Sequence, residues 1–334
     1  MALIEEIKKW KEKKVLIIGE ALVDEYLYGK AEGISPDAPV PIVKIERTSA
    51  FLGGIGRVIK YVKSLGGIPE VCTIVGDDYQ GNLFLKKMKE LNIDVHGVIK
   101  DKKIITPQIT KIKAMNQHML RLETDYSSNI PESILSKFYN LIESKSENIG
   151  SIIVLDYGIG GLFNDLFIQS LLQKLKNTYK NTPIIARPNF SNYYIYEEIE
   201  LIKMNLQKAL ETFSIDTTTD TSISIVGKKI LNSSKSKNVL LSYLESESYL
   251  LFKNSEKLLK FNPILQERVR SYVAVGSVIM AVLGLSYAAE IPVEEGVKIA
   301  LHSAALTASL PPVNFYNIEK LQNFILSKGN NKNC

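Results

Sequence analysis

Cysteine and histidine are scarce in this sequence of 334 residues, which has two of the former and three of the latter. Cys72 and Cys334 cannot build a disulfide framework, and their low number fits a reducing, cytoplasmic location. His96, His118 and His302 lie far apart, and none has a cysteine or histidine at metal-ligand spacing. The composition therefore argues against a disulfide-rich secreted protein, and no metal ligand is predicted.

Long apolar runs and a strong charge imbalance are also missing. The most apolar stretch, SVIMAVLGLSYAA at residues 277–289, is too short to cross a bilayer and predicts a buried helix. The N-terminal segment is charged and amphipathic, unlike a signal peptide. A net charge of +5 does not indicate the concentrated basic face of a nucleic-acid binder. We expect a soluble globular protein with neither a membrane nor a nucleic acid as partner.

Short apolar runs alternate with amphipathic segments along most of the chain. The runs predict strands at residues 13–19, 68–78, 151–158, 182–188 and 200–205, and two strands within 237–252. The amphipathic segments predict helices at residues 53–67, 79–93, 206–213, 292–310 and 318–327. This alternation predicts an α/β fold with a mostly parallel sheet covered by helices on both faces.

Two segments break this alternation. A proline-bounded strand at 39–46, and a hairpin at 108–123 with Asn116 and Gln117 at its turn, predict a small β appendage at one edge. No internal repeat or domain boundary is visible, so residues 1–334 are predicted to form a single domain.

Several stretches resemble one family, in the same order along the chain. Residues 19–46, GEALVDEYLYGKAEGISPDAPVPIVKIE, are similar to the opening of the heptose 7-phosphate kinases of lipopolysaccharide-core synthesis, which are ribokinase/PfkB sugar kinases. Residues 110–125 resemble the lid strands of these kinases, and residues 152–162, IIVLDYGIGGL, resemble a further segment. The resemblance implies a ribokinase-like Rossmann-type core, with a β-sheet lid formed by segments at about 20–50 and 104–124.

The resemblance also implies where the chemistry would lie. In PfkB kinases a segment of the form D-T/V-x-G-A-G-D, at a helix N-terminus, brings backbone N–H groups to the phosphate, and its last Asp is the general base. Here Ser277 stands at the position of the base, Ala274 replaces a glycine, and Gly276 is retained. A serine hydroxyl cannot accept a proton as a carboxylate does at neutral pH. We expect Ser277 to be inactive as a base and to serve as the N-cap of the following helix.

The acceptor-sugar site is kept in part. The corresponding substrate-binding residues are Asp24, Gly53, Gly54, Arg57, Lys111 and Arg121. Arg57 stands at the family's sugar-binding asparagine and would either fill the pocket or recruit an anion. Asp24 would bond a sugar hydroxyl or stabilise a turn. Lys111 and Arg121 would meet a sugar phosphate or face solvent as ordinary strand charges.

The nucleotide site departs further from the family pattern. The corresponding nucleotide-binding residues are Asn205, Ala274 and Gly276. Arg187 replaces an acidic residue, Lys208 replaces a glutamate, and Glu247 stands at a turn glycine, where a carboxylate would repel phosphates. Because the substitutions gather at the nucleotide and base positions, the sequence favours a degenerate kinase.

Three hypotheses follow. The first is a pseudokinase that binds a sugar phosphate or a partner subunit, such as an active kinase paralogue, and forms a homodimer through the lid. The second is an active carbohydrate kinase of heptose and lipopolysaccharide precursor synthesis that uses ATP and Mg²⁺, with a carboxylate from Asp24, Asp77, Asp156 or Glu267. The third is a scaffold whose dimerising lid matters and whose pocket is closed by Arg57. Cofactors are expected only for the active kinase.

Overall fold

The structure is a computed structural model. It describes residues 2–115, 117–125, 130–145, 148–159, 162–216, 218–264, 268–311 and 314–330. Asn116 of the predicted hairpin turn and the candidate carboxylate Glu267 lie outside these ranges. Within the described residues, no helix is long and apolar enough to span a membrane.

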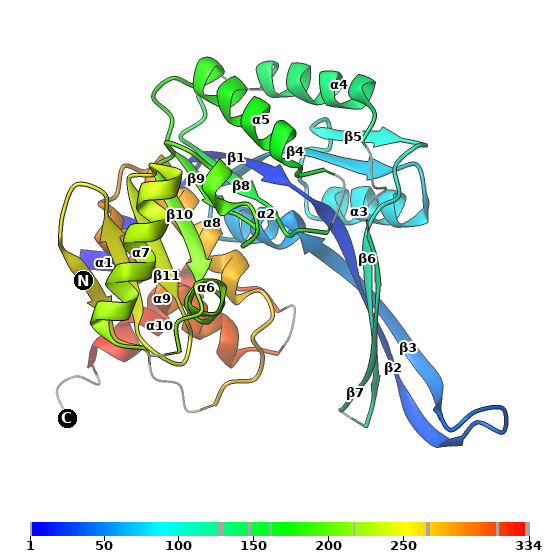
Figure 1. Ribbon diagram of the computed structural model, residues 1–334. Coiled ribbons are helices and arrows are strands. Elements are labelled where there is room, and N and C mark those ends of the chain that lie inside the picture. The colour runs from blue at the N-terminus through cyan, green and yellow to red at the C-terminus, as the bar shows by residue number, and fades with distance from the viewer. Residues whose placement is uncertain are drawn as a thin grey trace.

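A nine-stranded sheet forms the centre of the molecule (Figure 1). Its order is β13-β12-β11-β10-β9-β8-β1-β4-β5. Neighbouring strands from β11 to β5 pair in parallel, and β12 and β13 extend the sheet antiparallel. The bounds are β1 (Lys14–Gly19), β4 (Ile68–Gly76), β5 (Val98–Asp101), β8 (Ser151–Leu155), β9 (Ile184–Arg187), β10 (Leu201–Asn205), β11 (Asn238–Ser242), β12 (Ser248–Phe252) and β13 (Leu258–Phe261).

Helices cover both faces of this sheet, because successive side chains of a strand point to opposite sides. Val15 and Ile17 of β1 face one hydrophobic layer, and Leu16 and Ile18 face the other. The first layer contains α1 (Ala2–Lys8), α2 (Ile55–Ser64), α3 (Tyr79–Glu90), α8 (Val275–Ala288), α9 (Val293–Ser309) and α10 (Ile318–Asn330). The second contains α4 (Glu132–Glu143), α5 (Asp165–Thr178), α6 (Leu206–Thr212) and α7 (Asp220–Ser234), with a 3₁₀ turn η1 (Tyr193–Ile195). The predicted α/β fold class is confirmed.

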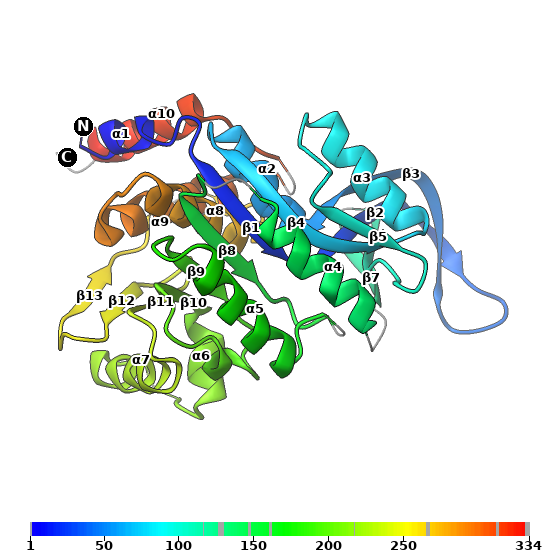
Figure 2. The same ribbon diagram turned by 90° about the horizontal axis from the view of Figure 1, so that it is seen from above.

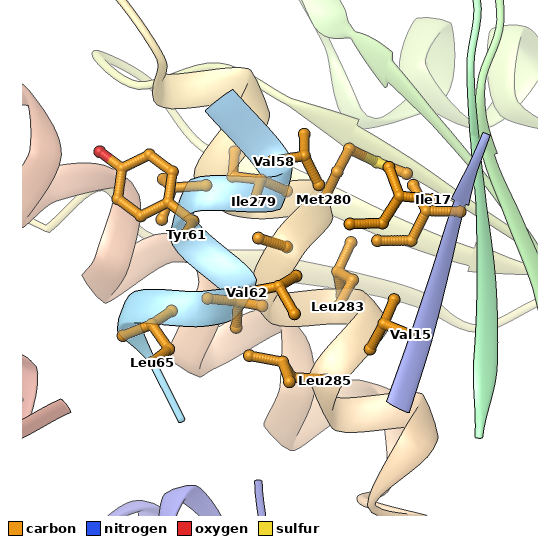
Figure 3. Close-up of a cluster of buried hydrophobic side chains, with 14 of the residues drawn as sticks. Val15, Ile17, Val58, Tyr61, Val62, Leu65, Ile279, Met280, Leu283 and Leu285 are labelled. Carbon is orange, nitrogen blue, oxygen red and sulfur yellow. The ribbon is translucent and has the colours of Figure 1, made fainter. Parts of the chain in front are cut away.

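Helix α8 packs deep in the first layer. Figure 3 shows Val62 of α2 and Leu283 of α8 meeting beside Val15 of β1. Gly284 lets α8 approach the sheet closely, because a Cβ at this position would lie 2.5 Å from Ile153 Cδ1. This packing fixes the first turn of α8 against the ends of β9 and β10, where a Cβ on Gly276 would come within 4.0 Å of side chains from both strands.

A second sheet of four strands projects from the core as a long ribbon, seen in Figures 1 and 2. It consists of β2 (Ala21–Ile34), β3 (Pro41–Gly54), β6 (Gln108–Ala114) and β7 (Gln117–Thr124), in the order β3-β2-β6-β7. Strand β2 follows β1 after the single residue Glu20, so the ribbon is rooted at the carboxyl edge of the central sheet. This confirms the predicted β appendage, which is called the lid below.

Candidate functional site

The root of the lid carries a buried ionic cluster around Asp24. Asp24 is fully buried on β2, and its Oδ1 accepts a hydrogen bond from Lys111 Nζ at 3.1 Å. Its Oδ2 accepts from Nη2 of Arg57, on α2. Lys111 Nζ also donates to the Tyr26 hydroxyl at 3.2 Å. Each oxygen of Asp24 therefore accepts from one buried cation, and Arg57 links the lid to α2 through this ion pair.

The two glycines at the end of β3 make this cluster possible. A Cβ on Gly53 would lie 2.7 Å from Asp24 Oδ2 and 2.1 Å from Leu22 Cδ1, so no larger residue fits. Gly54 has φ +52° and begins α2 as its N-cap, while a Cβ there would lie 2.2 Å from the Glu20 carbonyl oxygen. The glycines thus position both Asp24 and the helix that carries Arg57.

The lid face that bears Asp24 is positively charged. Lys111 lies opposite Arg121 in the β6–β7 register, so the two side chains share this face with Lys113. Lys111 is buried against Asp24, whereas Arg121 is about half exposed and pairs with Glu123. Burial and the charge of Lys111 lower the pKa of Lys113. This face offers positive charge to an anionic ligand.

Two buried carboxyl groups meet where β1 and β8 end. Glu20 is 1% exposed, its Oε2 accepts from the Tyr157 N–H at 2.6 Å, and its Oε1 has no partner among the described residues. Burial, together with the charge of Asp156, raises the pKa of Glu20 to about 8. Asp156 accepts from Asn192 Nδ2 at 3.0 Å and from the Tyr196 hydroxyl at 3.1 Å. Asp156 therefore stabilises the loop after β9.

A cavity of about 220 Å³ lies at the carboxyl ends of β9, β10 and β11, against α8 and α9. Two cations line it: Arg187, at the end of β9, and Lys203, which is only 5% exposed on β10. Burial, with the charge of Arg187, lowers the pKa of Lys203 to about 7. In the part of the chain that the structure describes, neither cation has a carboxylate partner, although Arg187 stacks over the Tyr157 ring at 4.7 Å.

The start of α8 borders this cavity. The prediction that Ser277 caps the helix is wrong, because α8 begins at Val275 and Ser277 is its third residue. The N-cap is Ala274, which has φ +70° and a methyl side chain that cannot accept a hydrogen bond. Among the described residues, the N–H groups of Gly276 and Ser277 have no acceptor. Ser277 itself is buried and is not among the residues that line the cavity.

The remaining predicted residues divide between the cavity and the surface. Asn205 lines the cavity and caps α6, its Oδ1 accepting from the Lys208 N–H at 3.0 Å. Glu247 lies between two lining residues but does not line the cavity, and its carboxylate pairs with Lys260 at 3.1 Å. Asp77 pairs with Lys100 at 2.7 Å beside β5.

The cavity offers few ligands of its own to a divalent metal ion. Its described lining has two cations and no carboxylate, so Mg²⁺ would depend on water, ligand phosphates and neutral oxygens such as the Asn205 amide. Nowhere in the described ranges do three His, Cys, Asp or Glu side chains gather to hold a metal. The cavity fits an anion instead. The analysis of the sequence missed Lys203, although a lone cation within the apolar strand LIKMN was a visible signal.

Residues 12–315 match the family described as pfkB family carbohydrate kinase, and the chain belongs to it. The resemblance seen in the sequence is thereby confirmed.

The individual curated relatives have low sequence identity to this chain. The bifunctional protein HldE of Syntrophotalea carbinolica is 26% identical over 318 residues, which cover 94% of this chain and 63% of the relative. That of Campylobacter fetus is 28% identical over 294 residues, covering 87% and 62%. The chain thus spans less than two thirds of the length of these curated relatives.

Solved structures agree on the fold. Phosphofructokinase-2 from Escherichia coli in complex with potassium has a TM-score of 0.77 at 16% identity, with 96% of this chain and 99% of that chain covered. Arabidopsis thaliana ribokinase complexed with ribose and ATP has a TM-score of 0.74 at 14% identity, with 94% and 99% covered. At these identities the likeness concerns the fold alone.

Proposed function

We propose that this chain is a heptose-7-phosphate-kinase-like protein that binds a sugar phosphate or a partner subunit without transferring a phosphoryl group. The observation that carries the proposal is the start of α8, where Ser277 stands at the base position and the neighbouring cavity presents Lys203 and Arg187. Phosphoryl transfer requires a base and neutralisation of the phosphates by metal ions. Loss of a general base alone lowers a rate by about 10²–10⁴.

Three of the four carboxylates considered as substitutes are engaged elsewhere, and the fourth, Glu267, lies outside the described residues. Asp24 is held by Arg57 and Lys111, Asp156 by two side-chain donors, and Asp77 by a lysine near β5. None of these three lines the cavity at the start of α8. Their geometry supports a protein without a working base.

The charge of the lid supports a phosphorylated sugar as the ligand. Lys113 and Arg121 share the face that bears Asp24. Arg121 pairs with Glu123, and burial together with the charge of Lys111 lowers the pKa of Lys113. A phosphate group would neutralise Lys113 and compete with Glu123 for Arg121. Because Arg57 occupies Asp24, the sugar hydroxyls would have to compete with an ion pair.

The test is an ADP-release assay with ATP, Mg²⁺ and heptose 7-phosphate, together with binding of the sugar phosphate by calorimetry. We expect binding without turnover. ATP-dependent phosphorylation that disappears in Lys111→Ala or Asp24→Ala would contradict the proposal, because both variants alter the sugar site and exclude a contaminating kinase.

An active kinase is the second candidate, and Glu20 favours it. Burial and the charge of Asp156 raise its pKa to about 8, so it is a carboxyl group with a perturbed pKa at the root of the lid, although it does not line the cavity at the start of α8. If the chain phosphorylates a sugar, Glu20→Gln should abolish turnover while the protein remains folded. Unchanged turnover in this variant would exclude Glu20 as the base.

The proposed homodimer would form through the lid. Leu120 and Leu122 of β7 are 52% and 50% exposed. Their register partners on β6 are Ile112 and Thr110, which lie on the face opposite to Lys111. An exposed apolar strip on a projecting sheet is typical of an interaction surface.

A further inference from the structure

We propose that Glu20 is a pH-sensitive latch at the root of the lid: its neutral carboxyl group holds β2 and β3 against the residues that follow β8, and its ionisation releases them. Such a latch goes beyond the proposed function, because it concerns how the lid is attached, whether or not a ligand binds or a phosphoryl group is transferred.

Glu20 is the single residue between β1, in the core, and β2, in the lid. Strand β1 ends at Gly19 and β2 begins at Ala21, so a rotation of the lid about this junction turns the backbone of Glu20. Figure 1 shows the chain running from β1 directly into the long ribbon of the lid. A side chain held at this position therefore fixes the lid relative to the core.

Three hydrogen bonds gather at this junction. The Glu20 side chain accepts at Oε2 from the Tyr157 N–H at 2.6 Å. The Tyr157 hydroxyl donates to the carbonyl oxygen of Gly54, at the end of β3, at 3.0 Å. The carbonyl oxygen of Glu20 accepts from the Ile55 N–H at 3.1 Å, where α2 begins. Both β2 and β3 are thus fastened at one point to the segment after β8.

The carboxyl group of Glu20 is closed off from solvent. Glu20 is 1% exposed, and its Oε1 has no hydrogen-bond partner among the described residues. A buried carboxylate oxygen without a donor is strongly unfavourable, because it has lost the water that would stabilise its charge. Water reaches Oε1 when the lid root moves away from the residues after β8. Ionisation of Glu20 and closure of this junction therefore oppose each other.

The groups that face Glu20 favour its neutral form on balance. Burial and the like charge of Asp156, which follows β8, raise the pKa of Glu20 to about 8. Arg187 of β9 and the N–H groups of Tyr157 and Ile159 lower this pKa, but they do not outweigh burial and Asp156. The proton is therefore kept up to mildly alkaline pH while the junction is closed.

Glu20, rather than Asp156, is the member of this pair that keeps the proton. Burial also raises the pKa of Asp156, but Asn192, the Tyr196 hydroxyl and the Gly158 N–H all donate to it and favour its charged form. The pKa of Tyr196 is raised far above its usual range, so this hydroxyl stays neutral.

The charges carried by the lid root and by α2 are already paired. Asp24 of β2 bonds Arg57 of α2 and Lys111 of β6. Ionised Glu20 would therefore gain no cation from the lid when it loses its proton.

The direction of the pH effect follows from these contacts. In an open junction Glu20 would be hydrated and would regain the ordinary pKa of a glutamate, so closure binds a proton between about pH 5 and about pH 8. The equilibrium constant for opening should rise with pH across this window, by at most about tenfold per pH unit, and level off above it.

The test is hydrogen–deuterium exchange of the full chain at about pH 6 and about pH 8.5, with each rate corrected for the intrinsic effect of pH on exchange. Peptides within residues 20–28 and 47–55 report on the lid root. We expect their protection to fall by about tenfold or more at the higher pH. Because the opening is local, about 1 M urea should not accelerate it, whereas exchange through global unfolding should be accelerated.

Glu20→Gln keeps an acceptor for the Tyr157 N–H and cannot ionise. Its lid root should be protected as in the wild type at about pH 6 and should lose no protection at about pH 8.5. Glu20→Met is a second variant that cannot ionise. It loses the bond to Tyr157, so we expect weaker protection of the lid root, equal at both pH values.

The control is Glu46→Gln, on β3 of the lid, which removes an exposed carboxylate paired with Lys30. It should keep the pH-dependent loss of protection seen in the wild type.

Three results would overturn the proposal: a lid root whose corrected protection is the same at both pH values, an equal loss of protection in Glu20→Gln and Glu20→Met, or exchange of the lid root that urea accelerates as it does in the core. These measurements contain neither ATP nor a sugar phosphate, so the latch and the proposed function can fail separately.

Discussion

Burial of Lys203 has a measurable effect on stability. Its pKa falls from 10.5 to about 7 in the folded protein, so the unfolded chain binds more protons between these values and stability rises with pH across this window. Arg187, Tyr243 and Tyr272 are the titratable groups that face the cavity with it in the described structure. Lys203→Met should therefore raise the free energy of unfolding more at about pH 6 than at about pH 9.

Urea denaturation at the two pH values measures this effect. Lys228→Met should show no such difference, because that lysine is exposed. Equal stabilisation at both pH values would mean that folding does not lower the pKa of Lys203, and would contradict this prediction.

Glu20 has the opposite pH dependence. Its pKa rises from 4.5 to about 8, because burial and the charge of Asp156 favour the neutral form. The folded state binds more protons between these values, so stability falls as pH rises through them. Glu20→Gln keeps an acceptor for the Tyr157 N–H and cannot ionise, so its melting temperature should fall less between about pH 5 and pH 8. A curve parallel to that of the wild type would contradict this prediction.

The ion pair at Asp24 should contribute to the stability of the folded protein. Arg57→Asn removes one of the two cations that bond the fully buried Asp24. We expect a loss of about 1.5–3 kcal/mol, the usual contribution of a hydrogen bond to a charged group. A double-mutant cycle with Asp24→Asn isolates the coupling, and additive effects of the two substitutions would refute it.

At the scale of elements, the approach of α8 to the sheet depends on Gly284. Gly→Ala within a helix normally stabilises a protein by about 0.5–1 kcal/mol. Here the new Cβ would lie 2.5 Å from Ile153 Cδ1 and 3.2 Å from Val15 Cγ1. We therefore expect Gly284→Ala to lower the melting temperature, and Gly284→Leu to cost about 1–3 kcal/mol or more. A higher melting temperature for Gly284→Ala would mean that the contact is easily relaxed.

The sequence predicted the core better than the lid. Core strands can be recognised from their own residues, whereas the lid depends on pairing between segments that are distant in the sequence. The buried strands β1, β4 and β8 are continuous apolar runs that can be recognised alone. The local pattern did not predict strand β2, and only the family resemblance placed residues at about 20–50 in a β-sheet lid. The outer half of β2 is exposed and mixes charges with glycines, and its pairing with β6 joins distant segments. The predicted strand at 39–46 is only part of β3, which continues to Gly54.

The candidate site shows the same division. Asp24, Arg57 and Lys111 were each recognised from the family pattern, but their mutual bonds link residues 33 and 87 positions apart. The residues near each of these positions in the sequence do not indicate such contacts. Lys203 was missed for a related reason, because its burial depends on α8 and on β9, far from it in the chain.

At the scale of the whole molecule, the lid should determine the oligomeric state. Leu122→Lys places a charge on the exposed apolar strip of β7 and should convert the proposed dimer into a monomer. Light scattering coupled to size-exclusion chromatography measures this mass change. Leu166→Lys, at a residue that is 77% exposed on α5, is the matched control and should leave the mass unchanged. A monomeric wild type would reject the proposed dimer.

If the chain transfers no phosphoryl group, as proposed, the ion pair at Asp24 also limits how kinase activity could be introduced. Replacing Ser277 by Asp would supply a carboxylate, but Arg57 would still bond Asp24, which the family resemblance assigns to sugar binding. Neither Ser277→Asp alone nor the replacement of Arg57 alone is expected to yield turnover, so the two substitutions would have to be combined. On the proposal that this chain transfers no phosphoryl group, an engineered kinase would therefore have to begin with the replacement of Arg57, whose ion pair links the root of the lid to α2.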